Sequence, residues 1–206
     1  EVIMAKGLKF LKIYSIVFST LLILIPTILL TSCKNNINQP KMIKLFNTKT
    51  QNIENLNLET YIQGVVAGEI QNSAPLEALK AQAVVARTYT LYKIKNGSKH
   101  EGADICDSSS CCQAWISKEN RLARWEEDVK EANWLKIEEA VSSTKGKYVT
   151  YNGEVINAFF HSNSGGITEI PSNVWGGSFE YLQVVETSGE ESYSGYSSEV
   201  TVTKDE

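Results

Sequence analysis

The chain has 206 residues, 20 lysines and arginines, 24 aspartates and glutamates, and a net charge of −4. This length fits one ordinary domain with an appendage or two small domains, and the acidic balance excludes the basic stripe that nucleic-acid binding needs. With 21% charged residues and four prolines, the composition excludes a wholly disordered or collagen-like chain. Four cysteines are too few for a disulfide scaffold but enough for one metal site or one bridge.

The N-terminal segment is basic and then strongly apolar. Three lysines are followed by an uncharged run of 18 residues that ends at Leu30, close to the ~20 residues that span a bilayer as a helix. Lysines in front of such a run place the rest of the chain outside the membrane. The L-T-S-C run that ends at Cys33 also matches a bacterial lipoprotein cleavage box, with Cys33 as the lipidated residue. We therefore expect residues 1–33 to be a membrane anchor or a lipoprotein signal, and residues 34–41 to be a polar linker to an extracytoplasmic domain.

The rest of the chain, residues 42–206, is predicted to form one α+β domain. Apolar residues recur there at helical spacing, and Asn152-Gly153 between two β-rich runs is the favoured pair of a type I′ hairpin. The run at 199–203 alternates like a strand without a partner, so we expect the domain to be incomplete at residue 206. The predicted elements are a strand at 42–46, helices around 62–70 and 76–95, a loop at 100–113, helices at 119–131 and 133–144, and a hairpin at 147–160.

Five runs of this region stand out in order along the chain. They are L-E-T-Y-I-Q-G-V-V-A-G-E-I at 58–70, L-E-A-L-K-A-Q-A-V-V-A-R-T-Y at 76–89, C-D-S to C-Q at 106–113, F-H-S-N-S-G-G at 160–166 and V-W-G at 174–176. Together they resemble the stage II sporulation protein D family.

The resemblance implies a membrane-anchored lytic transglycosylase of endospore-forming bacteria, which cleaves the glycan strands of peptidoglycan during engulfment of the forespore. It also implies two partners, a cell-wall amidase (stage II sporulation protein P) and a membrane protein (stage II sporulation protein M). Related domains occur in amidase enhancers, so a non-catalytic wall-binding module that stimulates an amidase is the alternative.

Glu69 is the predicted catalytic residue. Cleavage of a glycosidic bond needs a proton for the leaving oxygen, which a carboxylic acid in a partly apolar pocket supplies. Glu69 follows V-V-A-G, so we expect apolar surroundings, with Gly68 leaving room for a sugar ring. A glutamate near a helix end is often merely solvated, but Glu69 matches the catalytic glutamate of the family. No other acid has a comparable apolar frame, which favours a single-acid mechanism over the paired carboxylates of a hydrolase.

Three residues of the second predicted helix are candidates for binding the glycan. Lys80 and Arg87 share one face, and an arginine can hold a carboxylate through two hydrogen bonds. Arg87 lies in an apolar run and needs a partner, which the sequence leaves open between substrate and a structural carboxylate. Gln82 lies on the neighbouring face of the same helix, where its side chain either hydrogen-bonds sugar or packs against other residues.

Three further candidates follow the hairpin. The S-G-G loop, with His161 and Ser164, is expected to form the far wall of the glycan groove, because glycines allow close backbone approach. A serine-hydrolase interpretation is disfavoured, since the strained G-x-S-x-G elbow is missing. Tyr181 is a candidate stacking platform for sugar, with core packing as the alternative.

The loop after the second helix holds four potential metal ligands, His100, Cys106, Cys111 and Cys112. Thiolates and one imidazole suit tetrahedral zinc, and four protein ligands make a structural rather than a catalytic site. The family pattern supports Cys106 and Cys112 more firmly than the other two. The alternative is a disulfide from Cys106 to Cys111 or Cys112, which suits an exported protein but leaves one thiol unpaired.

Overall fold

The computed structural model describes residues 39–192 and 196–203. Contacts within the chain divide it into two units, Glu1–Gln39 and Pro40–Glu206, and nearly all described residues belong to the second. Within the described residues, no helix is both long and apolar enough to cross a bilayer. The anchor predicted for residues 1–33 lies outside the described residues.

A three-stranded sheet begins the second unit and confirms the first predicted strand. β1 (Met42–Asn47) pairs antiparallel with β2 (Asn52–Asn57) and parallel with β3 (Ile105–Cys106), so that β1 lies in the middle. Ile43 and Leu45 of β1 are buried in the core. The sequence does not predict β2, because its N-I-E-N-L-N run has no fully buried side chain and pairs with β1 through its backbone.

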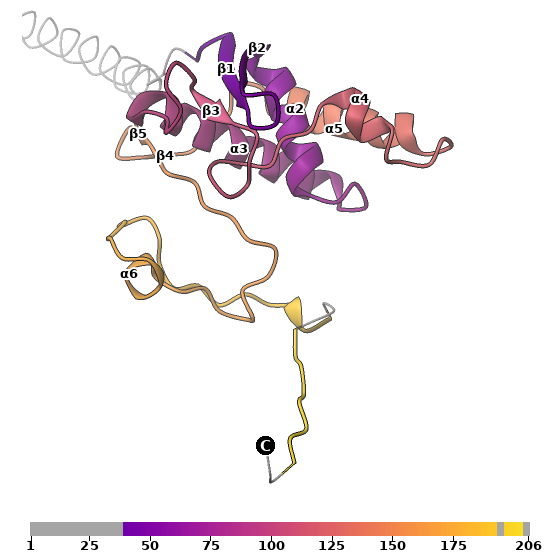
Figure 1. Ribbon diagram of the computed structural model, residues 1–206. Helices are drawn as coiled ribbons and strands as arrows, with labels where there is room; N and C mark the ends of the chain where they lie inside the picture. Colours follow the sequence, from indigo (N-terminus) through magenta and orange to yellow (C-terminus); the bar gives the residue numbers. More distant parts are fainter. Residues whose placement is uncertain (1–38, 193–195, 204–206) are drawn as a thin grey trace, which may run out of the picture. The chain divides into compact units, whose positions relative to one another are not determined.

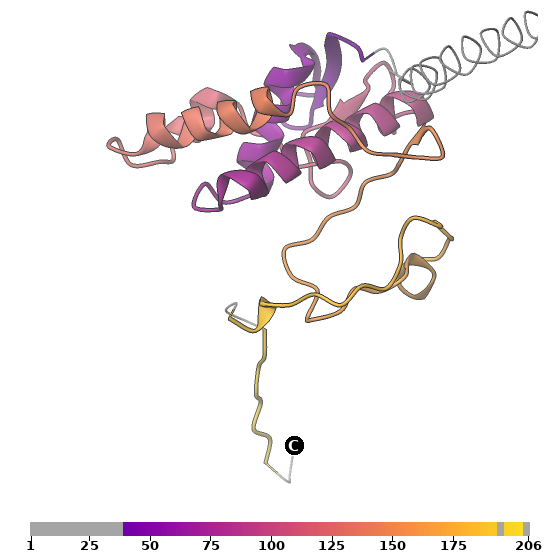
Figure 2. The same ribbon diagram turned by 180° about the vertical axis from the view of Figure 1, so that it is seen from behind.

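Three long helices pack against one another (Figure 1) and confirm the helices predicted around 62–70, 76–95 and 133–144. They are α2 (Leu58–Glu69), α3 (Leu76–Asn96) and α5 (Lys130–Ser143), and each contacts the other two. Two of them, α2 and α3, also pack against the sheet. Figure 2 shows α3 and α5 side by side. α2 begins earlier than the apolar spacing indicates, because the Asn57 side chain caps it by accepting a hydrogen bond from the Glu59 N–H at 2.9 Å. The buried residues that these helices give to the core include Tyr61, Ile62, Val65, Val66, Leu79, Ala83, Ala86, Trp134, Ile137, Ala140 and Val141.

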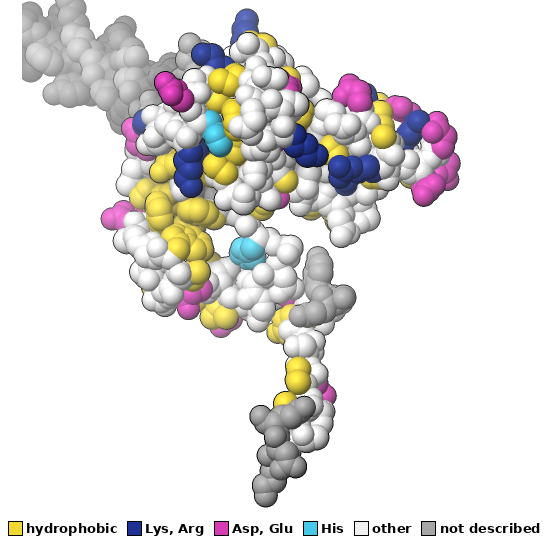
Figure 3. All heavy atoms as spheres, in the orientation of Figure 1, with side chains coloured by type: hydrophobic (Ala, Val, Ile, Leu, Met, Phe, Trp, Pro, Cys, Tyr) yellow, Lys and Arg dark blue, Asp and Glu magenta, His cyan; other side chains and the backbone are white. Residues whose placement is uncertain are grey.

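The prediction of a single helix over the charged segment 119–131 is wrong. α4 spans only Lys118–Leu122, capped by the Ser117 hydroxyl, and turns follow up to Val129 before α5 begins. The acidic run at 126–128 therefore stands in front of the first turn of α5, where negative charge is favourable. Figure 3 shows acidic side chains gathered at the tip of the α4–α5 region.

The predicted hairpin is confirmed at its turn, although its strands are short. β4 (Thr150–Tyr151) pairs antiparallel with β5 (Glu154–Val155). Asn152 and Gly153 between them have φ angles of 50° and 81°, as the positive values of a type I′ turn require.

Beyond β5 the described chain contains little regular structure. It forms α6 (Pro171–Val174), one isolated bridge between Ile167 and Glu186, and a 3-10 turn, η1 (Glu190–Ser192). The run at 199–203 is exposed and forms no strand, so the strand expected there is not present in the described part.

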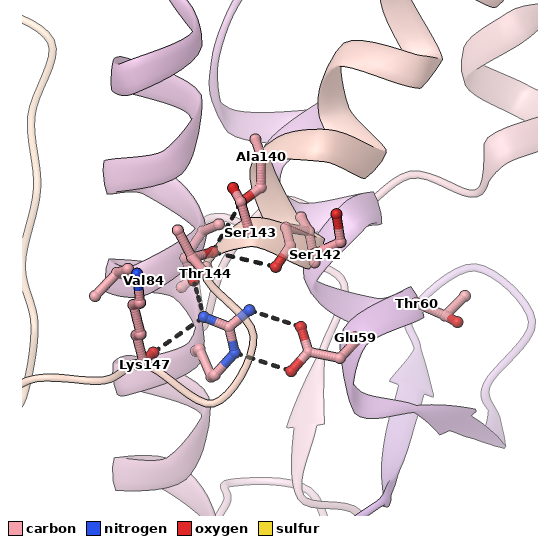
Figure 4. A network of polar contacts seen from close by, with 12 residues as sticks. Glu59, Thr60, Val84, Ala140, Ser142, Ser143, Thr144 and Lys147 are labelled. Atoms are coloured by element: carbon pink, nitrogen blue, oxygen red, sulfur yellow. Dashed lines mark hydrogen bonds and ion pairs between the residues drawn. The ribbon is translucent and has the colours of Figure 1, made fainter.

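A buried ion pair joins α2 to α3. Arg87 is 0% exposed; its Nε donates to Oε1 of Glu59 at 3.0 Å and its Nη2 to Oε2 at 2.6 Å. The remaining nitrogen, Nη1, donates to the carbonyl oxygens of Ala83 at 3.3 Å and Lys147 at 3.0 Å. Figure 4 shows the Glu59 carboxylate and the Lys147 carbonyl on opposite sides of this guanidinium. The pair therefore also fixes the chain that leaves α5.

We expect Arg87→Met to lower the free energy of unfolding by about 3 kcal/mol, because it leaves the Glu59 carboxylate largely buried without a partner. Lys80→Met on the same helix is the control, since the exposed pair of Lys80 with Glu77 is worth less than about 1 kcal/mol. Urea unfolding of the purified variants measures both changes. Equal losses in the two variants would show that the buried pair does not hold α2 and α3 together.

Candidate functional site

Glu69 is the last residue of α2, and one oxygen of its carboxylate is held by the backbone. The Ala114 N–H donates to Oε1 at 2.5 Å, while no described residue hydrogen-bonds Oε2. The side chain is neither fully buried nor fully exposed. A carboxylate that is oriented through one oxygen and open at the other has the geometry that proton transfer requires.

Two glycines of α2 bring the segment after the cysteine loop against the helix. A Cβ on Gly64 would lie 2.2 Å from Nε1 of Trp115 and 2.8 Å from the Ile116 carbonyl oxygen, and a Cβ on Gly68 would lie 2.9 Å from the Ala114 carbonyl oxygen. These distances are too short for any side chain, so only glycine permits this approach. The sequence predicts room for a sugar ring at Gly68. In the structure the Ala114 backbone occupies the space at the Cβ position of this glycine.

A pocket of about 410 Å³ lies next to the residues that precede and hold Glu69, although Glu69 itself is not one of its lining residues. Gly68, the residue before Glu69, and Ala114, which holds its carboxylate, both line this pocket. Sequence reasoning missed it because it draws on three distant regions of the chain, residues 47–49, 68 and 107–124. The only signal was the pair of arginines three residues apart in the R-L-A-R run. The other lining residues are Asn47, Thr48, Lys49, Asp107, Ser108, Ser109, Trp115, Ile116, Ser117, Asn120, Arg121 and Arg124.

The candidates on α3 do not line this pocket. Lys80 pairs with Glu77 at 2.7 Å and borders a separate hollow of about 400 Å³. Gln82 is 9% exposed, and its Nε2 has no hydrogen-bond partner among the described residues. Arg87 has the structural carboxylate, Glu59, rather than a position from which it can reach substrate. The sequence left open whether Arg87 binds substrate or a structural carboxylate, and in the structure its guanidinium binds the structural carboxylate of Glu59.

The candidates after the hairpin make their described contacts within residues 151–190. Ser164 donates its N–H and its hydroxyl to the carboxylate of Glu190, and the Gly166 N–H donates to the same group at 2.9 Å. Burial by itself would raise the pKa of Glu190, but hydrogen bonds from Gly166, Ser164 and Thr187 outweigh it and lower that pKa. The S-G-G loop therefore encloses a carboxylate of the same segment.

The other two candidates of this segment differ in their surroundings. His161 is exposed. The Tyr181 hydroxyl accepts a hydrogen bond from the Asn157 N–H at 3.2 Å, and its ring lies 5.6 Å from the rings of both Tyr151 and Phe179. Tyr181 thus belongs to a row of aromatic rings. None of these candidates borders the Glu69 pocket.

Three of the four predicted metal ligands come together after α3, and Cys112 is not part of that group. One ligand atom each from His100, Cys106 and Cys111 lies within 4.8 Å of the other two. The Cys111 Sγ lies 3.6 Å from Nε2 of His100 and 3.8 Å from the Sγ of Cys112. The His100 ring stacks on Phe46 of β1 at 4.3 Å. This stacking orients the imidazole toward the thiols.

All three cysteines of this loop are free thiols in the structure, so no disulfide joins them. Burial raises the pKa of Cys106 to about 12 and also raises the pKa of Cys112. Metal ions bind the thiolate, so an ion entering this cluster must displace protons. A set of soft sulfurs with one imidazole fits zinc.

The structure thus combines one glutamate oriented by a backbone amide, a neighbouring pocket and a separate thiol–imidazole cluster. A family model described as SpoIID, stage II sporulation protein, matches residues 46–151. Stage II sporulation protein D of Bacillus subtilis (strain 168) is 35% identical over 166 residues, which cover 80% of this chain and 48% of that protein. The chain belongs to the stage II sporulation protein D family.

Two other relatives match shorter stretches of this chain. Stage II sporulation protein D of Bacillus amyloliquefaciens is 35% identical over 150 residues, 72% of this chain and 43% of that protein. The amidase enhancer of Bacillus subtilis (strain 168) is 35% identical over 125 residues, 59% of this chain and 14% of that protein. The chain spans less than half the length of the sporulation proteins that it matches.

We expect Gly68→Ala to displace the Ala114 backbone from α2, because the new methyl group would meet its carbonyl oxygen at 2.9 Å. The clash outweighs the better helix propensity of alanine and costs about 1–2 kcal/mol of stability. Hydrogen exchange of the Ala114 amide should accelerate, since its bond to Glu69 is lost. Gln63→Ala, on the same helix, is the control and should leave this amide protected. Unchanged exchange in Gly68→Ala would contradict the close-approach argument.

Proposed function

We propose that the chain carries a peptidoglycan lytic transglycosylase domain that acts on glycan strands during sporulation, in forespore engulfment, with Glu69 as its only general acid and base. The observation that supports this most is the Glu69 carboxylate, held by the Ala114 N–H beside a polar pocket. Family membership supports the link to sporulation. The resemblance supplies the substrate class.

The proposed chemistry needs one proton carrier. Protonated Glu69 gives its proton to the glycosidic oxygen, and the bond from that oxygen to C1 of the muramic acid breaks. The resulting carboxylate takes the proton from the C6 hydroxyl of the same sugar, whose oxygen bonds to C1 and closes a 1,6-anhydro ring. No water is consumed, so no second carboxylate is required to activate one.

The acid that lines the pocket has a different task. Oδ1 of Asp107 accepts the Thr48 N–H at 3.0 Å, which ties the cysteine loop to the β1–β2 turn. This contact supports Glu69 acting alone. The alternative is a wall-binding module that stimulates an amidase, and the relative named amidase enhancer favours it. Cleavage by the isolated protein separates the two functions.

We further propose that His100, Cys106, Cys111 and Cys112 hold a structural zinc ion. The convergence of three of these ligand atoms supports it, as does the short distance from Cys111 to the fourth sulfur. Bound zinc would cross-link the loop through this chain's own thiolates and imidazole. Four protein ligands leave no open position for a reacting water.

The setting of the domain follows from the N-terminal sequence and the resemblance. We propose an extracytoplasmic domain anchored either by a membrane-spanning helix or by a lipid on Cys33. A cell-wall amidase and a membrane protein of the same sporulation stage are the proposed partners. The amidase enhancer relative supports a link to amidase action.

We expect Glu69→Gln to lower glycan cleavage by at least about 100-fold, because glutamine keeps the shape of the side chain but cannot donate its proton to the glycosidic oxygen. Mass spectrometry of peptide-free strands after incubation measures the anhydromuramyl ends. Glu77→Gln, an exposed glutamate on α3, is the control and should cleave normally. Near-normal release of anhydro ends by Glu69→Gln would exclude the single-acid mechanism.

Metal analysis of protein purified without chelator should find about one zinc ion per chain, because the ligand set is that of a closed structural site. Cys106→Ser should lose the ion, and zinc content should fall as the pH is lowered, since protons compete for the thiols. A protein without zinc, lighter than its reduced form by two hydrogens, would establish the disulfide instead.

A further inference from the structure

Three cationic side chains line the pocket beside Glu69, and they come from two separate segments. Lys49 lies in the turn between β1 and β2, while Arg121 and Arg124 belong to α4 and the turn after it. Among the lining residues the only acid is Asp107. The pocket therefore has an excess of positive charge, although the chain as a whole carries −4. Figure 3 shows lysine and arginine side chains on the face that bears α4.

Arg121 is held in place without a counter-charge. Its guanidinium lies 4.8 Å from the centre of the Trp125 ring, and its buried Nε has no hydrogen-bond partner among the residues that the structure describes. Burial and then the nearby charge of Arg124 lower the pKa of Arg121. A buried donor without a partner and two neighbouring positive charges are both unfavourable, and an anion in the pocket would relieve both.

Two of the acids near these cations, Asp107 and Glu127, have partners of their own. Within the described residues, no salt bridge reaches Lys49, Arg121 or Arg124. Asp107 accepts the Thr48 N–H, and Glu127, in the acidic run after Arg124, pairs with Lys130 at 2.7 Å. The cations of the pocket are thus left for a ligand.

We propose that Arg121 and Arg124, with Lys49, form a carboxylate-binding subsite for the glycan strand beside Glu69. The proposal rests on the function proposed above. Arginine matches the planar geometry of a carboxylate with two parallel hydrogen bonds. Gly68 and Ala114 line the same pocket, so a bound carboxylate lies next to the residues that precede and hold Glu69.

Muramic acid supplies such a carboxylate close to the bond that is cleaved. Its lactyl group is attached to the sugar ring that forms the anhydro product, and it is charged only when no stem peptide is attached. A stem peptide turns this group into a neutral amide but brings carboxylates of its own, farther from the ring. A panel of ligands tells the two sources of carboxylate apart.

The test measures, by titration calorimetry, how tightly the full chain binds a disaccharide of N-acetylglucosamine and N-acetylmuramic acid. With muramic acid at its reducing end this ligand has no bond of the type cleaved, so the measurement is independent of catalysis. The panel adds the same disaccharide with its lactyl group as a methylamide, and one that carries a stem peptide. We expect the free acid to bind about tenfold more tightly than the methylamide, the value of one charge-assisted contact.

Arg121→Gln and Arg124→Gln should each remove this preference while leaving the affinity for the methylamide unchanged. Arg124 is exposed, so its variant tests the subsite without disturbing the fold. Lys145→Gln, an exposed cation outside the pocket, is the control. If the peptide-bearing ligand binds like the methylamide, the lactyl group is the source; if it binds more tightly than both other ligands and loses this advantage in Arg124→Gln, the stem peptide is.

Equal affinity of the protein for all three ligands, or a preference that survives in Arg124→Gln, would overturn the subsite. A protein that prefers the free acid but releases no anhydro ends from glycan strands would contradict the proposed function and leave the subsite standing. A protein that cleaves glycan strands but binds the free acid no more tightly than the methylamide would contradict the subsite and leave the proposed function standing.

Discussion

The approach of residues 114–116 to the glycine face of α2 is the constraint on which the candidate site depends. Without side chains at Gly64 and Gly68, two carbonyl oxygens and an indole ring come within reach of the helix surface. This contact places the Ala114 N–H against Glu69 and forms one wall of the pocket. The acid, its hydrogen-bond donor and the binding space are thus set by a single packing event.

The cysteine loop and the candidate site share one stretch of chain. Gln113, which is 0% exposed, separates Cys112 from Ala114 and donates to the Ala86 carbonyl oxygen and the Thr90 hydroxyl of α3, both at 3.4 Å. The side chain of Gln113 fixes the loop between its two functional parts. The cysteine loop and the donor that orients Glu69 are therefore separated by one buried residue that is anchored on α3.

The sequence predicted what depends on local pattern. Apolar spacing located α2, α3 and α5, and the Asn152-Gly153 pair located the hairpin turn, because these signals lie within each element. It did not predict β2, which has no fully buried residue, or the end of α4 after one turn. It left the partner of Arg87 open, because Glu59 lies on another helix. The pocket is lined by three distant regions of the chain, and no local sequence pattern encodes their contact.

The pairing of β1 with β3 determines when these parts form during folding. Leu45 pairs with Ile105 in a parallel arrangement, with β2, α2 and α3 lying between them in the chain. Closing so long a loop is slow compared with forming a hairpin or a helix. The β1–β2 hairpin and the two helices can assemble first, and β3 then adds to the finished edge of β1. The thiols that follow β3 consequently stay reactive toward oxidants and metal ions until the last stage of folding, so the conditions at that moment decide which bonds they form.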